Sequence, residues 1–492
     1  MPQTTAPLAL GTLALTVLPA AALAQDCDPA QLFAEPVRIP AQAVDAATIV
    51  SADFNGDGIT DIATEGNAGV GFVNVLLGDG AGGFGPPTAF ATNQARPWGL
   101  SVGDVNGDGF VDIACGNVEG PDIAVLLGNG DGTFQDPIAV ALAIPQSLET
   151  GLADFDGDGV LDLIASDFDN NRLWLLRGGG DGTFSGATPI PAGLLPSYFT
   201  IADTDGDGNL DLVVANDASD DVSIIRGNGR GQFFAQQRFG TGLNPHRPVV
   251  ADVNADGVPD IVVGNFGSDS VSVLLGIDGL DYQPRVDYPV GDEPRHVRLA
   301  DFTGDAVTDV IVTNARSDDA SLLVGVGDGT FESEFRFAAA DGPIDGAAFD
   351  ADDNGAFDLV VVNRLSQDLT PLLNTCVPGL FITTQPQDAI ADVGAAAVFE
   401  VQASGPEPIA YQWLFNGGEI PGATQATLDV ASVGPLDMGF YSVRVEAGAE
   451  SVVSDAARLA VFNPCPGDFD GDGTLTIFDF LAFQNAFSAG CP

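Results

Sequence analysis

Short acidic segments recur seven times in the chain, and the first of them reads "DFNGDGITD" at residues 53–61. Each segment presents side-chain oxygens at its positions 1, 3, 5 and 9, and all but one have glycine at position 6. Calcium ions bind about six to eight oxygen ligands at about 2.3–2.6 Å, and glycine permits the sharp turn that gathers them. The spacing therefore predicts seven calcium-binding loops, in which the backbone carbonyl at position 7 is a further ligand.

The candidate side-chain ligands follow from this register. In chain order they are Asp53, Asn55, Asp57 and Asp61 in loop one; Asp104, Asn106, Asp108 and Asp112 in loop two; Asp154, Asp156, Asp158 and Asp162 in loop three; Asp203, Asp205, Asp207 and Asp211 in loop four; Asp252, Asn254, Asp256 and Asp260 in loop five; Asp301, Thr303, Asp305 and Asp309 in loop six; and Asp350, Asp352, Asn354 and Asp358 in loop seven. Loop six also has Ala306 in place of the glycine, so we expect it to bind calcium more weakly.

The loops differ from EF-hands, which need an acidic residue at position 12. No acidic residue stands there, since the seven positions are Thr64, Cys115, Ala165, Val214, Val263, Val312 and Val361. The β-branched flanks also indicate strands rather than helices. Solvated aspartate turns without metal are the alternative, but turn propensity alone does not explain a sevenfold recurrence.

The segments that surround the loops repeat with the same period. The loops begin 49–51 residues apart, at Asp53, Asp104, Asp154, Asp203, Asp252, Asp301 and Asp350, and a fixed period of this length indicates a repeat architecture. Each unit contains four short strand patterns, such as "DLVVAN" and "VSIIRG", separated by glycine-rich turns. We therefore predict an all-β fold with a seven-bladed β-propeller; a parallel β-helix is the alternative, although its repeat is normally shorter.

The two ends of the repeat region complement each other. The seventh unit stops at "LTPLLNTC", before a fourth strand, whereas "LFAEPVRIPAQAV" at residues 32–44 precedes the first unit as an unassigned strand. We expect this N-terminal strand to complete the seventh blade and close the ring, which would leave no open sheet edge. The closure would bring Cys27 near Cys376 and allow a disulfide, while Cys115 lies within a strand pattern and is expected to be a small buried residue.

The pattern D-x-[DN]-x-D-G-x-x-D, followed by hairpins such as "VSVLLG", resembles the FG-GAP (VCBS-type) repeat family. It is similar to the propeller of integrin α chains and of many secreted bacterial proteins. The resemblance covers roughly residues 30–376. It implies a β-propeller with structural calcium ions that join the first and second strands of each blade.

Composition points away from nucleic acid and toward export. The net charge is −53, and all 16 basic residues are arginine, so the chain should repel nucleic acid and anionic membranes. Residues 1–24 read as a signal peptide, with cleavage after Ala24 at "ALA"; a membrane anchor is the alternative, although the segment lacks basic flanks. No later segment is long and apolar enough to span a bilayer, and export would permit disulfides.

Residues 378–463 follow the propeller, assigned to 25–377, with short alternating strand patterns. "YQW" at residues 411–413 and "DMGFYSV" at 437–443 resemble an immunoglobulin-like β-sandwich. The resemblance implies that Trp413 is the core tryptophan and Tyr441 the tyrosine-corner residue, with Val401 and Val443 in place of the usual cysteines. A fibronectin-type sandwich is the alternative, and the expected role is that of a spacer or binding module.

The last segment, 464–492, contains an EF-hand-like ligand set made of Asp468, Asp470, Asp472, the Thr474 carbonyl, Thr476 and Asp479. Apolar residues at helical spacing follow it. It resembles a dockerin-type tail bracketed by Cys465 and Cys491, which implies a disulfide and a sorting or attachment role. A full dockerin has two such loops, whereas this segment has one; a solvated acidic tail is the alternative.

The candidate ligand face lies opposite the acidic loops. It would carry Trp98, Tyr198, His246, Arg247, Arg295 and His296 at equivalent places of the repeat, with Asp345 in the same column. A repeated asparagine stands nearby, at Asn117, Asn216, Asn265, Asn314 and Asn363. Ordinary surface is the alternative for the first set, and turn chemistry is the alternative for the asparagines.

No G-x-S-x-G, HExxH, paired CxxC or phosphate-loop motif is present, and the aspartates are assigned to metal. We therefore expect no catalytic residues and a binding or adhesion protein, secreted or attached to the cell surface, whose ligand is a protein or a glycan. The tail would attach to a surface partner or a cohesin-like one. The alternative is a polysaccharide lyase or hydrolase on a calcium-binding propeller, with Arg247, Arg295 and His296 as its candidate residues.

Overall fold

Strands form almost all of the regular structure in the computed structural model, which describes residues 27–462 except 42–44, 68, 94, 121, 143–145, 278–280, 377–379, 406–407 and 448–449. The described residues contain no α-helix, and three short 3-10 turns are present: η1 (Pro29–Gln31), η2 (Phe168–Asn170) and η3 (Pro435–Asp437). The predicted signal peptide and the predicted dockerin-like tail, with Cys465 and Cys491, lie outside these residues. The prediction of an all-β chain is confirmed for the described part.

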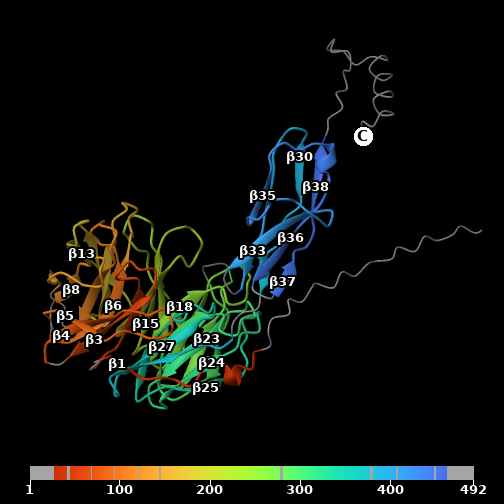
Figure 1. Ribbon diagram of the computed structural model, residues 1–492. Helices are drawn as coiled ribbons and strands as arrows, with labels where there is room; N and C mark the ends of the chain where they lie inside the picture. The colour runs from red at the N-terminus through yellow and green to blue at the C-terminus, as the bar shows by residue number, and fades with distance from the viewer. Residues whose placement is uncertain are drawn as a thin grey trace, which may run out of the picture. The chain divides into compact units, whose positions relative to one another are not determined.

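The chain divides into two compact units, which Figure 1 colours red to cyan and blue. Among the described residues, the first unit contains residues 27–376 and 405–409, and the second contains residues 380–404 and 410–462. The main boundary near residue 378 agrees with the position at which the repeat ends in the sequence. The two units are described one at a time below.

Seven four-stranded antiparallel sheets make up the first unit. Six of them contain four consecutive strands: β2 (Ile49–Ala52), β3 (Asp61–Asn67), β4 (Gly71–Leu76) and β5 (Thr88–Ala91); β6 (Pro97–Gly103), β7 (Asp112–Asn117), β8 (Asp122–Leu126) and β9 (Ile138–Ala141); β10 (Thr150–Ala153), β11 (Asp162–Asp167), β12 (Arg172–Gly178) and β13 (Phe184–Pro191); β14 (Pro196–Ala202), β15 (Asp211–Asn216), β16 (Asp221–Ile225) and β17 (Gln237–Gly240); β18 (Pro245–Ala251), β19 (Asp260–Asn265), β20 (Ser270–Leu274) and β21 (Val286–Pro289); β22 (Pro294–Ala300), β23 (Asp309–Asn314), β24 (Asp319–Leu323) and β25 (Phe335–Ala338).

The seventh sheet combines both ends of the repeat region. It consists of β26 (Pro343–Phe349), β27 (Asp358–Asn363), β28 (Asp368–Leu372) and the N-terminal β1 (Ile39–Pro40), which is the edge strand next to β28. β1 pairs antiparallel with β28, with Ile39 opposite Leu369. A disulfide joins Cys27 to Cys376, as expected from the sequence. Cys115 is buried and unpaired, also as expected.

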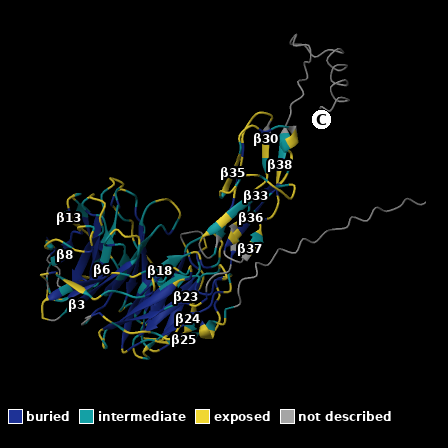
Figure 2. Ribbon diagram, in the orientation of Figure 1, coloured by how far each residue is buried: buried dark blue, intermediate teal, exposed yellow. Residues whose placement is uncertain are grey.

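The second and third strands of each sheet are buried on both faces, which Figure 2 shows as dark blue ribbons. Side chains alternate across a strand, so Ile62 packs on the seventh sheet while Ala63 packs on the second. The same alternation continues from sheet to sheet along the chain, and each sheet shares an apolar cluster with the next. The first sheet shares its other cluster with the seventh, through Ile49, Ile344 and Val360 among others.

The second unit contains three smaller sheets. One runs in the order β30 (Ala389–Asp392), β38 (Ala457–Phe462), β36 (Gly439–Ala447), β33 (Ile409–Phe415) and β34 (Gly418–Glu419), with β37 (Glu450–Val453) paired to β36; the others pair β29 (Phe381–Thr384) with β32 (Gln402–Ser404) and β31 (Ala397–Glu400) with β35 (Thr427–Val430). Trp413 is completely buried at its centre. Within the described residues of the whole chain, no helix has the length and apolar character needed to cross a membrane.

Candidate functional site

Each acidic loop joins the first and second strands of its sheet, and its ninth residue begins the second strand. In loop one, the buried Asp61 accepts hydrogen bonds from Phe54 N at 3.0 Å and from Gly78 N at 2.8 Å. The same pair of hydrogen bonds to position 9 recurs in the other six loops. This carboxylate therefore ties the loop to the end of the third strand.

Positions 1 and 5 shape the turn itself. Asp53 accepts hydrogen bonds from Gly56 N at 2.7 Å and Gly58 N at 2.9 Å, and Asp57 accepts one from Ile59 N at 2.8 Å. Burial opposes the ionisation of Asp53, but these backbone N–H groups outweigh it and lower the pKa of Asp53. The turn needs a positive φ at position 6, which is 85° at Gly58. Loop six keeps this turn with Ala306 at 66°, a conformation unfavourable for a residue with a Cβ atom.

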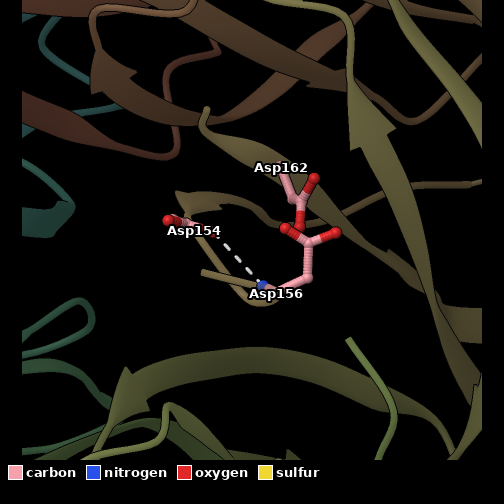
Figure 3. A group of neighbouring side chains, drawn as sticks. All are labelled: Asp154, Asp156 and Asp162. Atoms are coloured by element: carbon pink, nitrogen blue, oxygen red, sulfur yellow. Dashed lines mark hydrogen bonds between the residues drawn. The ribbon is translucent and has the colours of Figure 1, made fainter. Parts of the chain in front are cut away.

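Three loops bring three carboxylates together in a way that suits a cation. Ligand oxygens from positions 1, 3 and 9 lie within 4.8 Å of one another in Asp154, Asp156 and Asp162 of loop three; in Asp203, Asp205 and Asp211 of loop four; and in Asp350, Asp352 and Asp358 of loop seven. Figure 3 shows the loop-three group, in which the carboxylates of Asp156 and Asp162 face each other. Oxygen-only donor sets of this kind suit calcium.

The fit with the predicted ligand set is partial. Asp158 and Asp207, at position 5 of loops three and four, are not members of these groups, because their carboxylates accept the N–H of position 7. Loops one, two, five and six have asparagine or threonine at position 3, so they lack a third carboxylate at that point. The structure therefore brings positions 1, 3 and 9 together and leaves position 5 in the turn.

An arginine from the end of the third strand reaches two of the loops. Arg177 forms ion pairs with Asp156 and Asp162, at 3.2 Å from the latter, and Arg226 lies 3.2 Å from Asp205. The equivalent positions of the other sheets hold Leu77, Leu127, Leu275, Val324 and Leu373. Loops three and four are also the only two with aspartate at all four ligand positions. These two arginines were not predicted from the sequence. The aligned repeats nevertheless show that an arginine stands at this position only in the two repeats whose loops have four aspartates.

The candidate ligand face forms a second group, which we call the polar cluster. Its members lie five residues before each loop, at the start of the first strand of each sheet, together with two residues from β3 and β22. They are Thr48, Gly99, Glu149, Tyr198, Arg247, His296 and Asp345, with Glu65 and Arg298. Tyr198, Arg247, His296 and Asp345 belong to strands β14, β18, β22 and β26.

Ion pairs join members of the polar cluster that come from non-neighbouring sheets. Arg247 of the fifth sheet lies 2.5 Å from Glu149 of the third and 3.9 Å from Asp345 of the seventh. Asp345 also lies 2.7 Å from His296 Nδ1 and 2.6 Å from Arg298. Burial alone would raise the pKa of Asp345, but Arg298, His296 and Arg247 hold it well below its usual range. Burial lowers the pKa of His296 to about 4, against the pull of Asp345.

Two glutamates in the polar cluster are buried. Glu65 accepts hydrogen bonds from Thr48 N, the Thr48 hydroxyl and Gly99 N, and burial raises its pKa to about 7. Burial likewise raises the pKa of Glu149 to about 7, although Arg247 opposes the shift. Sequence analysis missed both glutamates. Glu65 had a recognisable signal, because it is an acid within the apolar strand "DIATEG".

Aromatic and histidine rings fill the space beside these ion pairs. Trp98 Nε1 donates to the Tyr198 hydroxyl at 3.3 Å, and the Tyr198 ring lies 5.1 Å from His246 and 5.0 Å from His296. Burial raises the pKa of Tyr198 to about 12. Trp98, Tyr198, His246 and His296 are all buried, so they form neither the predicted exposed ligand face nor ordinary surface. The structure brings together five of the six residues of the predicted ligand face, and Arg295 stands beside them, 4.2 Å from the ring of Phe266.

The repeated asparagines have a structural role. Asn216 is fully buried, donates to Asp221 and Ser223 at 2.8 Å each, and accepts from Gly193 N at 2.9 Å. Asn265, Asn314 and Asn363 donate to the equivalent residues of their own sheets. These four asparagines therefore tie the end of the second strand of each sheet to the start of the third.

Comparison with known families identifies the repeat class. The model of the FG-GAP-like repeat matches residues 53–115, 104–165, 154–214 and 203–263. Each match begins at the first aspartate of a loop and ends twelve residues into the next, in register with the sheets described above. This part of the chain is therefore built from FG-GAP-like repeats, as the loop pattern indicated. No curated protein sequence matches the chain.

Solved structures offer only distant similarities. A functionally unknown protein from Desulfotomaculum acetoxidans is 13% identical, with 61% of this chain and 88% of that chain covered and a TM-score of 0.44. A chimeric titin Z1Z2 is 24% identical over 18% of this chain and 98% of that chain, with a TM-score of 0.16, and titin domain M7 is 24% identical over 17% and 94%, also at 0.16. At these TM-scores, none of the similarities assigns a fold or a function to the chain.

Proposed function

We propose that the protein is an exported, calcium-stabilised, non-catalytic binding protein whose seven sheets close into a β-propeller. The observation that carries this proposal is the sevenfold acidic loop, which ends in a buried carboxylate in every sheet. Carboxylates that are crowded together repel one another, and burial strengthens the repulsion. A bound divalent cation removes this repulsion at each loop.

Two contacts support closure of the ring. The first and seventh sheets share an apolar cluster, and β1 supplies the fourth strand of the seventh sheet. The polar cluster also joins the third sheet to the fifth and the fifth to the seventh, and Trp98 beside it joins the second sheet to Tyr198 of the fourth. Side chains from sheets that are not neighbours meet in this way when the sheets surround a common axis. An open spiral of sheets would separate these side chains.

Calcium would bind through positions 1, 3 and 9 of each loop, with the carbonyl at position 7 and water completing the shell. At about ten times its dissociation constant, each ion adds about 1.4 kcal/mol to the free energy of unfolding. Seven such ions contribute on the order of 10 kcal/mol, which is comparable with the stability of a whole domain. The ions would therefore be structural, since each one holds the first and second strands of a sheet together.

Export and attachment form the next part of the proposal. The disulfide between Cys27 and Cys376 suits an oxidising compartment, in agreement with a signal peptide at 1–24. The tail at 464–492 is proposed as a calcium-binding sorting or attachment module with a surface or cohesin-like partner. The signal peptide and the tail lie outside the described residues, so the structural support for export is the disulfide between Cys27 and Cys376.

We propose an immunoglobulin-like fold for the second unit. The Tyr441 hydroxyl donates to the carbonyl of Asp437 at 2.9 Å, the bond expected of a tyrosine corner. The ring of Tyr441 stacks on Phe399 at 4.7 Å, beside the buried Trp413. Val401 and Val443 are both buried at the positions predicted for the absent cysteines. Apolar packing would therefore replace the usual disulfide in this spacer or binding module.

A non-catalytic role agrees with the burial of the polar cluster. His296 is 1% exposed and Tyr198 is 3% exposed, so a polymeric substrate has no access to either ring. The pair of His296 and Asp345 beside Tyr198 is nevertheless the observation that favours the alternative, a polysaccharide lyase or hydrolase. Assays on acidic polysaccharides, with His296→Ala as the control, test it: turnover that His296→Ala abolishes would replace the binding proposal.

A glycan array probed in calcium and in chelator tests the binding role. We expect specific binding that calcium supports and chelator reduces, because any binding surface of the first unit requires ordered sheets. The proposal would be contradicted if the protein bound no glycan or protein ligand in calcium or in chelator and instead turned over a polysaccharide.

A further inference from the structure

Arg295 stands apart from the other arginines of this strongly acidic chain. Thirteen of the sixteen lie within 4.0 Å of a carboxylate oxygen. Arg230 and Arg458 make no ion pair but are exposed to solvent. Arg295 is the remaining one, and it is partly buried with no carboxylate partner among the described residues.

The surroundings of Arg295 hold its guanidinium in place without neutralising it. Its guanidinium carbon lies 4.2 Å from the centroid of the Phe266 ring, a stacking arrangement that favours a cation. Its Nε is buried and has no hydrogen-bond partner among the described residues. Glu293 and Asp217 favour its charge electrostatically but form no ion pair with it. Burying a cation without a directly paired counter-ion costs free energy, so this guanidinium has an unmet capacity for an anion.

A cavity of about 330 Å³ opens at this guanidinium. It lies between the sixth and seventh sheets and the segment before the first, and Arg295, Arg364, Asp45 and Glu293 supply its polar lining. Arg364 is already paired with Asp45 at 2.8 Å, and Glu293 lies 3.5 Å from Arg316. Asp45 is also paired with Arg96 at 2.8 Å through its other oxygen. Arg295 is therefore the uncommitted cation of the cavity, and Glu293 has more free acceptor capacity than Asp45.

This lining selects among anions. A carboxylate group matches the planar fork of a guanidinium and can accept two parallel hydrogen bonds. The carboxylates of Asp45 and Glu293 are compensated by Arg96, Arg364 and Arg316, and their remaining lone pairs can accept hydrogen bonds from neutral hydroxyl groups. Ile344, Ala315 and Leu365 provide apolar walls. The volume is at the lower end of the range of about 300–1,000 Å³ for ligand pockets, which suits a single ring-sized group.

We propose that this cavity binds a hydroxylated monocarboxylate, namely a sugar acid, with its carboxylate on Arg295 and its hydroxyl groups on Glu293 and Asp45. The inference rests on the proposed binding function and specifies its ligand class. An acidic peptide fits the cavity less well, because its side chains offer carboxylates without neighbouring hydroxyl donors.

Isothermal titration of the full chain with glucuronate, in saturating calcium, tests the proposal. We expect glucuronate to bind, glucose and sulfate to bind at least tenfold more weakly, and Arg295→Leu to weaken glucuronate binding at least tenfold. Arg295→Lys keeps the charge and should recover part of the affinity. Arg230→Leu is the matched control, because it removes an exposed and unpaired arginine outside the cavity, and it should bind like the wild type.

The outcomes separate this proposal from the proposed function. Equal affinity of Arg295→Leu and wild type for glucuronate, or equal binding of glucuronate and glucose, would overturn the sugar-acid site. Tight binding of a tetra-aspartate peptide that depends on Arg295 would replace it with a peptide site. If an array identifies ligands that bind independently of Arg295, the sugar-acid site is wrong and the binding function stands. Equal thermal midpoints of wild type and Arg295→Leu verify that the variant folds.

Discussion

At the residue scale, the seven loops share one net charge. Loops one, two, five, six and seven each have three aspartates among the four ligand positions, which gives −3. Loops three and four have four aspartates, but Arg177 and Arg226 each contribute one positive charge, so the sum is −4 + 1 = −3. Loop seven has aspartate at position 3, Asp352, but no arginine beside it. Its position 5 is the neutral Asn354, so the charge of its four ligand positions is also −3. A common charge implies a similar electrostatic attraction for a divalent ion at each loop, so the weaker binding expected of loop six comes from Ala306 in its turn.

A double-mutant cycle in loop three tests this charge matching. Arg177→Leu alone leaves four aspartates uncompensated, and we expect it to lower the free energy of unfolding in chelator by about 1 kcal/mol, after screening by solvent, and to strengthen calcium binding. Asp156→Asn alone should weaken calcium binding. The double variant has the ligand set of loop two, with Leu in the arginine position, and should return close to wild type.

Chemical unfolding in chelator and calcium titration of the four proteins provide the measurement. Because the two residues are in contact, their effects should be non-additive by about 1 kcal/mol. Strict additivity would show that Arg177 does not compensate Asp156. Arg230→Leu is again the matched control, since Arg230 is exposed and makes no ion pair.

Glu65 gives a prediction of pH dependence. Burial raises its pKa from an ordinary 4.5 to about 7 in the folded protein, so the folded state binds the proton more tightly than the unfolded state between these values. The contribution of Glu65 to the free energy of unfolding is therefore greatest below pH 4.5, and it decreases as the pH rises toward 7. Relative to Glu65→Gln, the free energy of unfolding of the wild type should decrease by roughly 3 kcal/mol over this interval.

Urea unfolding of both proteins in saturating calcium, from pH 4.5 to 7.5, measures this difference. The comparison with Glu65→Gln cancels the titration of the other carboxylates. Parallel pH profiles would mean that Glu65 is ionised throughout and that its environment compensates the burial.

At the element scale, the sequence was sufficient to predict most of the repeat. The period places each loop between two strands, because apolar and β-branched residues follow the ninth aspartate in every unit. The N-terminal strand was also predictable, since only the seventh unit lacks a fourth strand and only "LFAEPVRIPAQAV" lacks a partner. The disulfide follows from that pairing.

The disulfide should contribute strongly to stability, because it encloses a segment with a sequence separation of 349 residues. In the loop-entropy account, such a cross-link contributes roughly 6 kcal/mol. We expect Cys27→Ser/Cys376→Ser to lower the melting temperature of the first unit in calcium. Mass spectrometry that found both thiols free in the folded wild type would contradict the pairing, and an unchanged melting temperature would contradict its stabilising role.

In the second unit, Tyr441→Phe removes the hydrogen bond to the Asp437 carbonyl and keeps the ring that stacks on Phe399. A single neutral hydrogen bond contributes about 1 kcal/mol, so we expect a loss of that size in the unfolding of this unit. Tyr411→Phe, at a partly exposed tyrosine, is the control and should unfold like the wild type. Equal stability of the two variants would show that the hydrogen bond from Tyr441 to Asp437 does not stabilise the unit, which would contradict the tyrosine corner.

At the scale of the whole molecule, the polar cluster shows what the sequence did not reveal. Its members occupy one column of the repeat, so their common place was visible, but the identity of their partners was not. Glu149 pairs with a residue 98 positions away, and His296 with one 49 positions away, which depends on how the sheets are arranged. Burial was equally hidden, because histidine and arginine are usually surface residues.

The central claim is that calcium ions occupy the acidic loops of a closed ring of seven sheets. Anomalous diffraction from crystals grown in millimolar calcium tests it most directly, because it locates each ion and the sheets around it together. The account predicts an ion among the oxygens of positions 1, 3 and 9 in each loop, with weaker density in loop six. Loops without any ion, or sheets arranged as an open spiral, would contradict it.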